Sequence, residues 1–421
     1  MGPDAKGDER LLPVDEVRER ILAAIHPILP LSLPLAEAYG CVLAEDLRAG
    51  MDLPPFASSA MDGFAVRAAD VAGASYADPV ELPVVGRAPI GEAPKAAVGA
   101  LEAVRIATGA PIPIGANAIV PIEDCEPVLG EGEGSVRVFV PTEVGRHIRP
   151  AGEDLRTGDA LLSAGQRLLA PELGLLAAAG VHHPLVHPRP RVVVLSTGDE
   201  LVPPEATLEY GQIHDSNAYL LYAALRDAGA IPIMAGIASD DVEEVRDLVL
   251  SLANQADAFV SSGGVSVGER DVVKAAFFQR GEIDFYKVAM QPGKPQGFGA
   301  IEGKPYFGLP GNPVSVFVSF EVFLRPALIK LAGRRDLARP EVSARLDTAH
   351  VDPCVEGAVR WGDERRVEAG AFVATPVGGR GSNLIGSVAR ANGLAVIPAG
   401  QGSAAAGARV RVLLYRSAGD G

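Results

Sequence analysis

The sequence has little cysteine, few aromatic residues and no excess of positive charge, and these shortages exclude several classes of protein. Its 421 residues include three cysteines, one tryptophan and 5% aromatic residues in all. Cys41, Cys125 and Cys354 are scattered, and their spacing fits neither a disulfide framework nor a zinc site. The net charge of −15 argues against nonspecific nucleic-acid binding, which needs lysines and arginines to neutralise phosphates.

A secretory leader and a long hydrophobic run are also missing. The chain starts with M-G-P-D-A-K-G-D-E-R, which has no apolar core of a signal peptide. The longest apolar stretch, at 160–181, is interrupted by Gln166, Arg167, Pro171 and Glu172, so it does not read as a membrane span. These absences predict a cytoplasmic protein with no membrane partner and no nucleic-acid partner.

The common phosphate-binding motif of NTPases does not occur. The absence of G-x-x-x-x-G-K-[ST] disfavours a P-loop NTPase. The G-E-G-E-G string at 130–134 predicts a hairpin turn, because no helix follows it as a dinucleotide loop requires. The composition, 48% apolar and 22% charged, is that of a globular protein, and the length predicts several domains.

The middle of the chain alternates apolar strands with helices from about residue 190. Continuous apolar strands in such an alternation predict a doubly wound, mainly parallel sheet covered on both faces. The expected strands are 191–195, 231–237, 257–261 and 283–289, the expected helices are 215–229, 240–254 and 271–280, and 304–330 reads as a strand, a Gly/Pro turn and a helix.

The regions on either side have different patterns. Val14, Val17 and Ile21 recur at helical spacing, and this helix should end before Pro27. Residues 49–156 are rich in proline and glycine with short apolar runs, which predicts an inserted β module. After about residue 338 short strands return and predict a small C-terminal β domain. The fold class is therefore α/β and multidomain.

Acidic residues follow three of the predicted sheet strands. Glu200 comes after the first strand, Asp240 after the second, and Asp271 closes the loop after the third. Carboxylates gathered at the carboxyl ends of strands suit Mg²⁺, which takes oxygen ligands and bridges to phosphates. The alternative is that these acids cap helices, since Asp240 and Asp271 each precede one. The coincidence of three acids at one sheet edge favours the metal.

Two loops and two lysines point to an anionic ligand. In L-P-G-N-P, Asn312 fits the N-cap and Pro313 the first helical position, so backbone N–H groups at the helix start could bind an anion. Lys287 and Lys294 flank a P-G-K-P turn and could bind phosphate or an oxyanion, although a solvated lysine is the ordinary alternative. Together these features predict an enzyme for a phosphorylated ligand.

The motifs together resemble one family, the molybdopterin molybdenumtransferases of the bacterial MoeA type, which include the gephyrin E domain. The matching strings run in family order over about residues 10–415; they are S-S-A-M-D-G-F-A, T-G-A-P-I-P-I-G-A-N-A-I-V-P-I-E, R-P-A-G-E-D-L-R-T-G-D, L-S-T-G-D-E-L-V, G-Q-I-H-D-S-N, S-S-G-G-V-S-V-G-E-R-D, K-V-A-M-Q-P-G-K-P and L-P-G-N-P-V-S.

The resemblance implies molybdenum insertion into adenylylated molybdopterin, with molybdate as substrate, Mg²⁺ as cofactor and AMP released. It also implies a homodimer whose cleft is completed by the partner's β module, and a possible transient contact with the molybdopterin adenylyltransferase. Two alternatives stay open: the adenylyltransferase reaction itself, whose enzyme has a similar central domain, and a non-enzymatic scaffold like gephyrin.

The site residues implied by the resemblance fall in every region. They are Asp271, Lys287 and Lys294 as catalytic residues; Asp62, Thr108, Asp154, Ser261, Gly263, Gly264, Asn312, Ser315, Arg360 and Ser382 as substrate-binding residues; and Glu200, Asp240 and Asp271 as metal ligands.

The implied domains are a central α/β domain (10–30 and 188–338), a linker and dimerisation domain (31–48 and 157–187), the β module (49–156) and the C-terminal β domain (339–421).

Three positions depart from the family pattern. Gln291 stands where a basic residue is common, Asn117 replaces the more usual aspartate, and the sequence A-V-R-W-G-D-E-R-R around Arg360 departs from the family's pattern and leaves its register open. The sequence does not separate molybdate from tungstate, since the two oxyanions have the same charge and shape.

Overall fold

The computed structural model describes residues 11–129, 133–238, 241–263, 275, 283–347, 357–361, 372–378, 381–398 and 404–416. The chain divides into two compact units. The first, here called the α/β unit, comprises Met1–Ala44, Gly165–Leu168 and Leu185–Gly421, and the second, the β unit, comprises Glu45–Ala164 and Leu169–Pro184. Every helix within the described residues is too short or too polar to cross a lipid bilayer.

A six-stranded sheet forms the centre of the α/β unit. Its strands, in spatial order, are β17 (Ile231–Ala238), β14 (Arg191–Thr197), β18 (Ala258–Ser262), β21 (Lys304–Leu309), β20 (Pro295–Ile301) and β19 (Ile283–Lys287). The first four are parallel, whereas β20 is antiparallel to both of its neighbours. The mainly parallel sheet is thus confirmed, but strand β20 was not predicted. Since β19 and β21 both oppose β20, β19 runs in the same direction as the parallel strands.

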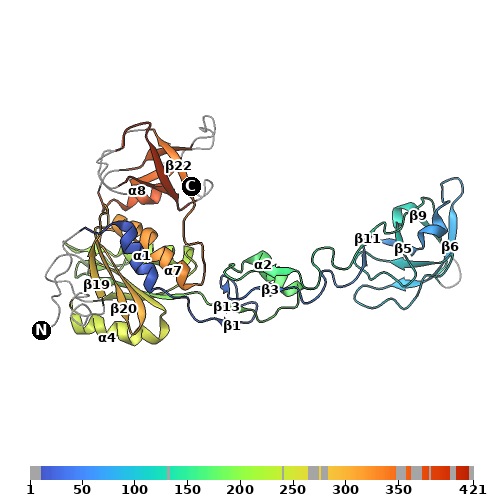
Figure 1. Cartoon of the computed structure of the whole chain (residues 1–421), viewed down its shortest axis with the longest axis horizontal. Helices are drawn as coiled ribbons and strands as arrows, with labels where there is room; N and C mark the ends of the chain where they lie inside the picture. The colour runs from blue at the N-terminus through green and yellow to red at the C-terminus, as the bar shows by residue number, and fades with distance from the viewer. Residues whose placement is uncertain are drawn as a thin grey trace. The chain divides into compact units, whose positions relative to one another are not determined.

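Helices cover both faces of this sheet, as the apolar strands require. Val192 and Val194 of β14 pack with α1 (Val14–Ala24), α3 (Ser216–Asp227), α6 (Pro313–Ser319) and α7 (Arg325–Leu331). The alternate residues of β14 pack on the other face with α4 (Val242–Leu252). Figure 1 shows α1 and α7 side by side on one face and α4 on the other. The doubly wound arrangement is therefore confirmed.

Side-chain caps determine where two of these helices begin. The carboxylate of Asp215 accepts a hydrogen bond from the Ala218 amide at 3.0 Å, and α3 ends before Gly229, whose φ of +90° suits glycine. Asp241 caps α4 by accepting from the amides of Glu243 and Glu244. Asp240 lies outside the described residues.

The helix predicted after the Gly/Pro turn is not a uniform α-helix. Between α6 and α7 lies a π-helical turn, η5 (Phe320–Leu324), all of whose residues are buried. Pro326 occupies the first turn of α7, where its missing N–H group is least costly. A π turn in a long helix often marks a functional element.

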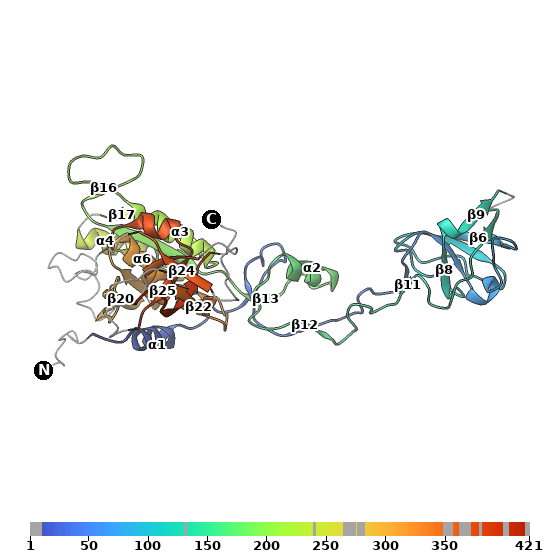
Figure 2. The same cartoon turned by 90° about the horizontal axis from the view of Figure 1, so that it is seen from above.

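Smaller β structures complete the α/β unit. A closed barrel contains β22 (Glu341–Leu346), β24 (Phe372–Pro376), β23 (Gly357–Trp361), β25 (Gly393–Val396) and β26 (Arg409–Leu414), with α8 (Ile385–Arg390) beside it. A three-stranded sheet joins β1 (Leu31–Ser32), β13 (Leu185–His187) and β2 (Val42–Leu43). Figure 2 shows the open loop between β15 (Leu201–Val202) and β16 (Ile213–His214) extending from this unit.

The β unit is built mainly of short strands. Its six-stranded sheet has the order β8 (Ala118–Pro121), β5 (Gly63–Val66), β7 (Ala103–Ile106), β6 (Val80–Ala88), β10 (Ser135–Val138) and β9 (Cys125–Val128). Two further pairs join β4 (Ser58–Ser59) to β11 (Ile148–Arg149) and β3 (Leu47–Arg48) to β12 (Ala160–Leu162), and α2 spans Ala170–Ala178. Strands β9 and β10 pair antiparallel, as the predicted hairpin requires, and residues 130–132 of its turn lie outside the described residues. Cys41 and Cys125 are free thiols.

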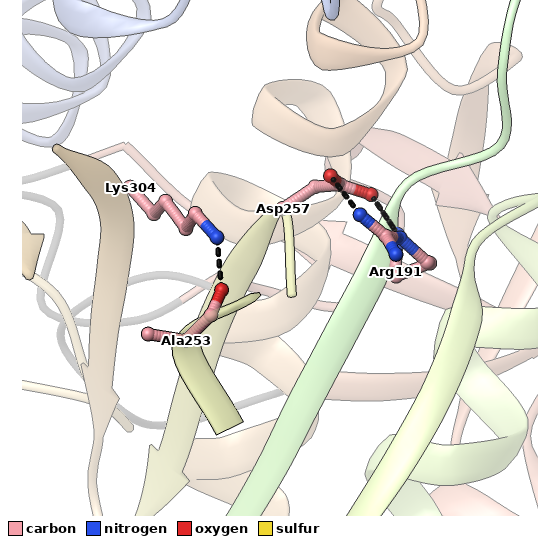
Figure 3. Close-up of polar contacts among 4 residues, drawn as sticks. All are labelled: Arg191, Ala253, Asp257 and Lys304. Carbon is pink, nitrogen blue, oxygen red and sulfur yellow. Dashed lines mark hydrogen bonds and ion pairs between the residues drawn. The ribbon is translucent and has the colours of Figure 1, made fainter. Parts of the chain in front are cut away.

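Two polar contacts fasten the amino ends of the central strands (Figure 3). Arg191, the first residue of β14, donates two guanidinium hydrogen bonds of 3.0 Å to Asp257, which precedes β18. The Asp257 carboxylate also accepts from the Arg191 amide at 2.8 Å. Lys304, at the start of β21, donates its ammonium group to the carbonyl of Ala253. These contacts stand at the sheet edge opposite to the strands' carboxyl ends.

We expect Asp257→Asn to lower the free energy of unfolding of the α/β unit by about 1 kcal/mol, because the pair loses its charge-assisted bonds while remaining partly exposed. Urea denaturation, monitored by hydrogen exchange of amides in β14 and β18, measures this change in the free energy of unfolding. Glu243→Gln is the control, since its exposed carboxylate lies 3.5 Å from Arg246 and should contribute little. Equal effects of the two variants would contradict the expectation.

Candidate functional site

The carboxyl ends of the parallel strands bring three loops into contact. The Gly263 amide, just after β18, donates to the carbonyl of Leu309 at the end of β21, at 3.1 Å. Gly263 has a φ of +87°, and a Cβ there would lie 2.9 Å from the Thr197 carbonyl oxygen at the end of β14. A side chain would therefore push these strand ends apart. The close approach explains why glycine occupies position 263. It also predicts that closely packed backbone forms the base of a ligand site at this edge.

Hydroxyl groups on β18 lie below this edge rather than at it. The Ser261 hydroxyl and the Tyr306 hydroxyl are 2.5 Å apart, and both residues are almost fully buried. Ser262 and Ser196 form a second buried pair, with 3.4 Å between their hydroxyl oxygens. Ser261, predicted to bind substrate, is thus hydrogen-bonded inside the protein. Its position favours a role in stabilising the loop that follows β18. Gly264 lies outside the described residues.

Lys287 and Lys294 lie on either side of the turn that connects β19 to β20. Lys287 is the last residue of β19 and is half-buried, while Lys294 precedes β20 and is exposed. The Val288 amide donates to the Lys294 carbonyl at 2.8 Å and closes the turn. Because β19 runs parallel to β21, this hairpin lies at the same sheet edge as Gly263. The fold therefore gathers the two predicted lysines and the glycine loops on one edge.

The lysine hairpin is fixed against helix α6. The Gln296 side-chain amide donates to the Gly293 carbonyl and to the Ser319 hydroxyl, each at 2.6 Å. Gly293 has a φ of +101°, and a Cβ there would come within 2.9 Å of both Met290 and Ser319. The turn can therefore approach the helix only with glycine at this position. This packing restricts the backbone that carries Lys294.

The L-P-G-N-P loop and the helix start that follows it make a hydrogen bond that the sequence did not predict. Asn312 takes the N-cap position of α6 and Pro313 the next, as predicted, but the Asn312 side chain forms no capping hydrogen bond. The Val314 amide donates to the carbonyl of Ser382 at 3.0 Å. This helix-start amide is therefore bonded to the C-terminal barrel region and is not open to an anion. The contact brings predicted residues Ser315 and Ser382 into one neighbourhood.

Asn217 is a residue of this edge that the site prediction omitted. Its side-chain amide donates to the Gly311 carbonyl at 2.7 Å and holds the same loop from the start of α3. Its side-chain oxygen is buried and has no hydrogen-bond partner in the described part of the protein. The string G-Q-I-H-D-S-N contained the signal, but only the fold shows that its asparagine reaches the loop.

The predicted metal ligands are described only in part. Glu200 is exposed just after β14, and its carboxylate folds back so closely that a Cβ on Gly198 would lie 2.7 Å from it. Asp240 and Asp271 lie outside the described residues. Among the residues described, no group of three or more acidic, histidine or cysteine side chains is arranged to hold a metal. Of the three predicted metal ligands, Glu200 is the one that the described residues include.

In the β unit, two of the predicted residues are hydrogen-bonded to each other. The carboxylate of Asp62, before β5, accepts from the amide and hydroxyl of Thr108, after β7, at 2.7 and 3.0 Å. These bonds hold the pKa of Asp62 below its usual value. Asp154 is exposed in the same unit. Asn117, which replaces an aspartate, still accepts from the Ala68 amide at 2.7 Å, so an oxygen acceptor suffices there.

Arg360 lies in β23 of the C-terminal barrel, where it pairs with Thr375. The structure does not describe its side chain, so its predicted role in substrate binding stays a prediction.

We expect Thr108→Val to raise the pKa of Asp62 toward the usual value of about 3.9, because the variant removes the hydroxyl donor and retains the amide. Since the folded pKa is lowered, the stabilisation is present above the unfolded pKa and is lost as pH falls through the folded one. Carboxyl NMR titration measures the shift. Thr157→Val is the matched control: Thr157 bonds Asp52 in the same manner, and this variant should shift Asp52 alone.

Gly293→Ala should open the lysine hairpin, because the new methyl group meets both a left-handed backbone and two nearby side-chain atoms. The measurement is hydrogen exchange at the Val288 amide, which should lose protection. Gly303→Ala is the control, since Gly303 has a φ of +73° with nothing within 4 Å of a Cβ. Equal loss of protection at Val288 in both variants would show that steric contact with α6 is unimportant.

Three family regions match the chain in order. They are the MoeA N-terminal region (domain I and II) at residues 12–180, a probable molybdopterin binding domain at 193–330, and the MoeA C-terminal region (domain IV) at 364–415.

Full-length relatives and solved structures are similar to the chain. Molybdopterin molybdenumtransferase 2 of Mycobacterium tuberculosis is 41% identical over 408 residues, covering 95% of this chain and 98% of the relative. Molybdopterin molybdenumtransferase of Haemophilus influenzae is 33% identical, covering 96% and 98%. The crystal structure of the molybdopterin biosynthesis MoeA protein from Pyrococcus horikosii has a TM-score of 0.78 at 33% identity, covering 97% of this chain and 100% of that one.

Proposed function

The chain belongs to the MoeA family of molybdopterin molybdenumtransferases, and from this premise we propose that it inserts molybdenum from molybdate into adenylylated molybdopterin with release of AMP. The enzyme acts in molybdenum cofactor biosynthesis. The observation that carries the proposal is the gathering of Lys287 and Lys294 with the Gly263 loop at one edge of the central sheet.

Charge is the chief difficulty of this reaction. Molybdate is a dianion and the pyrophosphate of the adenylylated pterin is also negative, so the two repel each other in the site. At an effective dielectric of about 20, one close cation is worth several kcal/mol before desolvation. Lys287 and Lys294 offset the repulsion and stabilise charge on the departing AMP phosphate. Their fixed hairpin provides this charge without reorganisation, because Gly293 and Gln296 hold it against α6.

Mg²⁺ is the proposed cofactor of this site. The exposed carboxylate of Glu200 fits it, because Mg²⁺ prefers oxygen ligands and keeps several waters of its own. When bound, the ion would neutralise phosphate charge. Asp240 and Asp271 are proposed as the further ligands from their positions in the sequence.

A homodimer is the proposed assembly. In this proposal Asp62, Thr108 and Asp154 of one subunit reach the cleft of its partner, and the hydrogen bonds from Thr108 favour the ionised form of Asp62. Contact with the molybdopterin adenylyltransferase is proposed as transient, since that enzyme would supply the adenylylated substrate.

The adenylyltransferase reaction is the second candidate function. It is favoured only by the central α/β fold, whereas the N-terminal and C-terminal family regions cover the rest of the chain. An assay with purified protein, Mg²⁺ and molybdate separates the two. Molybdate-dependent AMP release from adenylylated molybdopterin supports insertion, and adenylylation of free molybdopterin by ATP would support the alternative. A protein with neither activity would overturn both.

Lys287→Ala should reduce molybdate-dependent AMP release by about 100-fold, because it removes a positioned charge from the site. Lys304→Ala is the control: Lys304 begins β21 at the opposite edge of the same sheet, where it bonds the Ala253 carbonyl. The control should keep its turnover even if it unfolds more readily. Equal turnover of the two variants would remove Lys287 from the proposed site.

A further inference from the structure

The C-terminal barrel packs on the central helices through both polar and apolar contacts. Besides the bond from the Val314 amide to Ser382, Phe317 of α6 packs edge-to-face on Tyr415, with 4.9 Å between ring centroids. Between these contacts lies a cavity of about 260 Å³. It is lined by α3, α6 and η5 on one side and by α8, Tyr415 and Arg416 on the other. Leu394, Leu413 and Tyr415 of the barrel region also pack on the central core, and the polar contacts add directional constraints to this packing.

Glu321 makes the best-formed of these polar contacts. It lies in the π turn η5 and is 7% exposed. Its two carboxylate oxygens accept from Nε and Nη2 of Arg339 at 2.8 and 2.7 Å, in a bidentate pair. Arg339 comes two residues before β22, so the pair fastens the point where the chain enters the barrel.

A second arginine depends on the same carboxylate. Nε of Arg325 lies 3.9 Å from Glu321 and has no hydrogen-bond partner in the described part of the protein. Burial, together with the charge of Arg339, lowers the pKa of Arg325 to about 10. One buried carboxylate thus compensates two arginines, and its loss would leave both charges facing each other.

We propose that Glu321 is a positioning residue that sets where the C-terminal barrel sits and thereby keeps Ser382 at the start of α6. The kinetic part of this inference rests on the proposed function, and the structural part does not.

A continuous set of contacts connects Glu321 to Ser382. The Leu414 amide donates to the Pro340 carbonyl directly after Arg339, which joins the barrel's last strand to its first. Tyr415, the next residue, donates its hydroxyl to the Val388 carbonyl of α8 at 2.8 Å. The turn before α8 contains Ser382, whose carbonyl accepts from Val314. Releasing Arg339 therefore loosens the support of Ser382 without altering a residue that touches substrate.

The test measures the barrel's position in the full-length chain. Spin labels on Asp247→Cys of α4 and Ala405→Cys of the barrel, with the three native cysteines replaced by alanine, report an interdomain distance distribution. We expect Glu321→Ala and Arg339→Ala to broaden it, and Glu321→Asp to restore it in part. Asp257→Asn is the matched control, because it removes a bidentate carboxylate–arginine pair within the central sheet and should leave the distribution unchanged.

The same variants are then assayed for molybdate-dependent AMP release. We expect the KM for molybdate to rise about tenfold in Glu321→Ala with a smaller change in kcat, because a displaced binding group weakens oxyanion binding first. An unchanged distance distribution in Glu321→Ala overturns the inference. A broadened distribution with an unchanged KM upholds the positioning role of Glu321 and instead removes Ser382 from the proposed oxyanion site.

Discussion

The shared direction of the central strands is the constraint on which the candidate site depends. Because β14, β18, β21 and β19 all run the same way, their following loops meet at one edge. The reversed strand β20 makes this possible for β19, since it turns the chain back through the hairpin that carries Lys287 and Lys294. The two lysines and the Gly263 loop are gathered there by strand direction, not by proximity in the sequence.

The helix formed by α6, η5 and α7 connects this edge to the rest of the α/β unit. Its first turn bonds Ser382, its Ser319 receives the lysine hairpin, and its π turn presents Glu321 to the arginine that precedes the barrel. A single element therefore contacts the proposed binding edge, the hairpin that carries the proposed catalytic lysines, and the C-terminal barrel. Such an element can transmit a shift at the barrel to the site because its contacts are buried and specific.

Sequence patterns among neighbouring residues correctly predicted individual helices and strands. The helix expected over 215–229 and the apolar strand expected over 191–195 each depend on neighbours in sequence, and both appear where expected. Strand β20 was missed because its sequence, P-Q-G-F-G-A-I, begins with proline and contains two glycines, which disfavour a strand. The sequence predicted an anion site at the start of α6 but not the hydrogen bond there. The Val314 amide donates to the carbonyl of Ser382, which lies 68 residues away in the sequence.

The sequence by itself determined the family, the strand–helix alternation and the residue types near the sheet edge, because these follow from motifs and short-range periodicity. The tertiary structure decided which of those residues meet. Ser261 is turned inward to Tyr306, Asn217 reaches the Gly311 carbonyl, and Glu321 bonds Arg339 across the entry to the barrel. Each of these contacts joins segments far apart in the chain, and such pairings depend on packing, which no local pattern encodes.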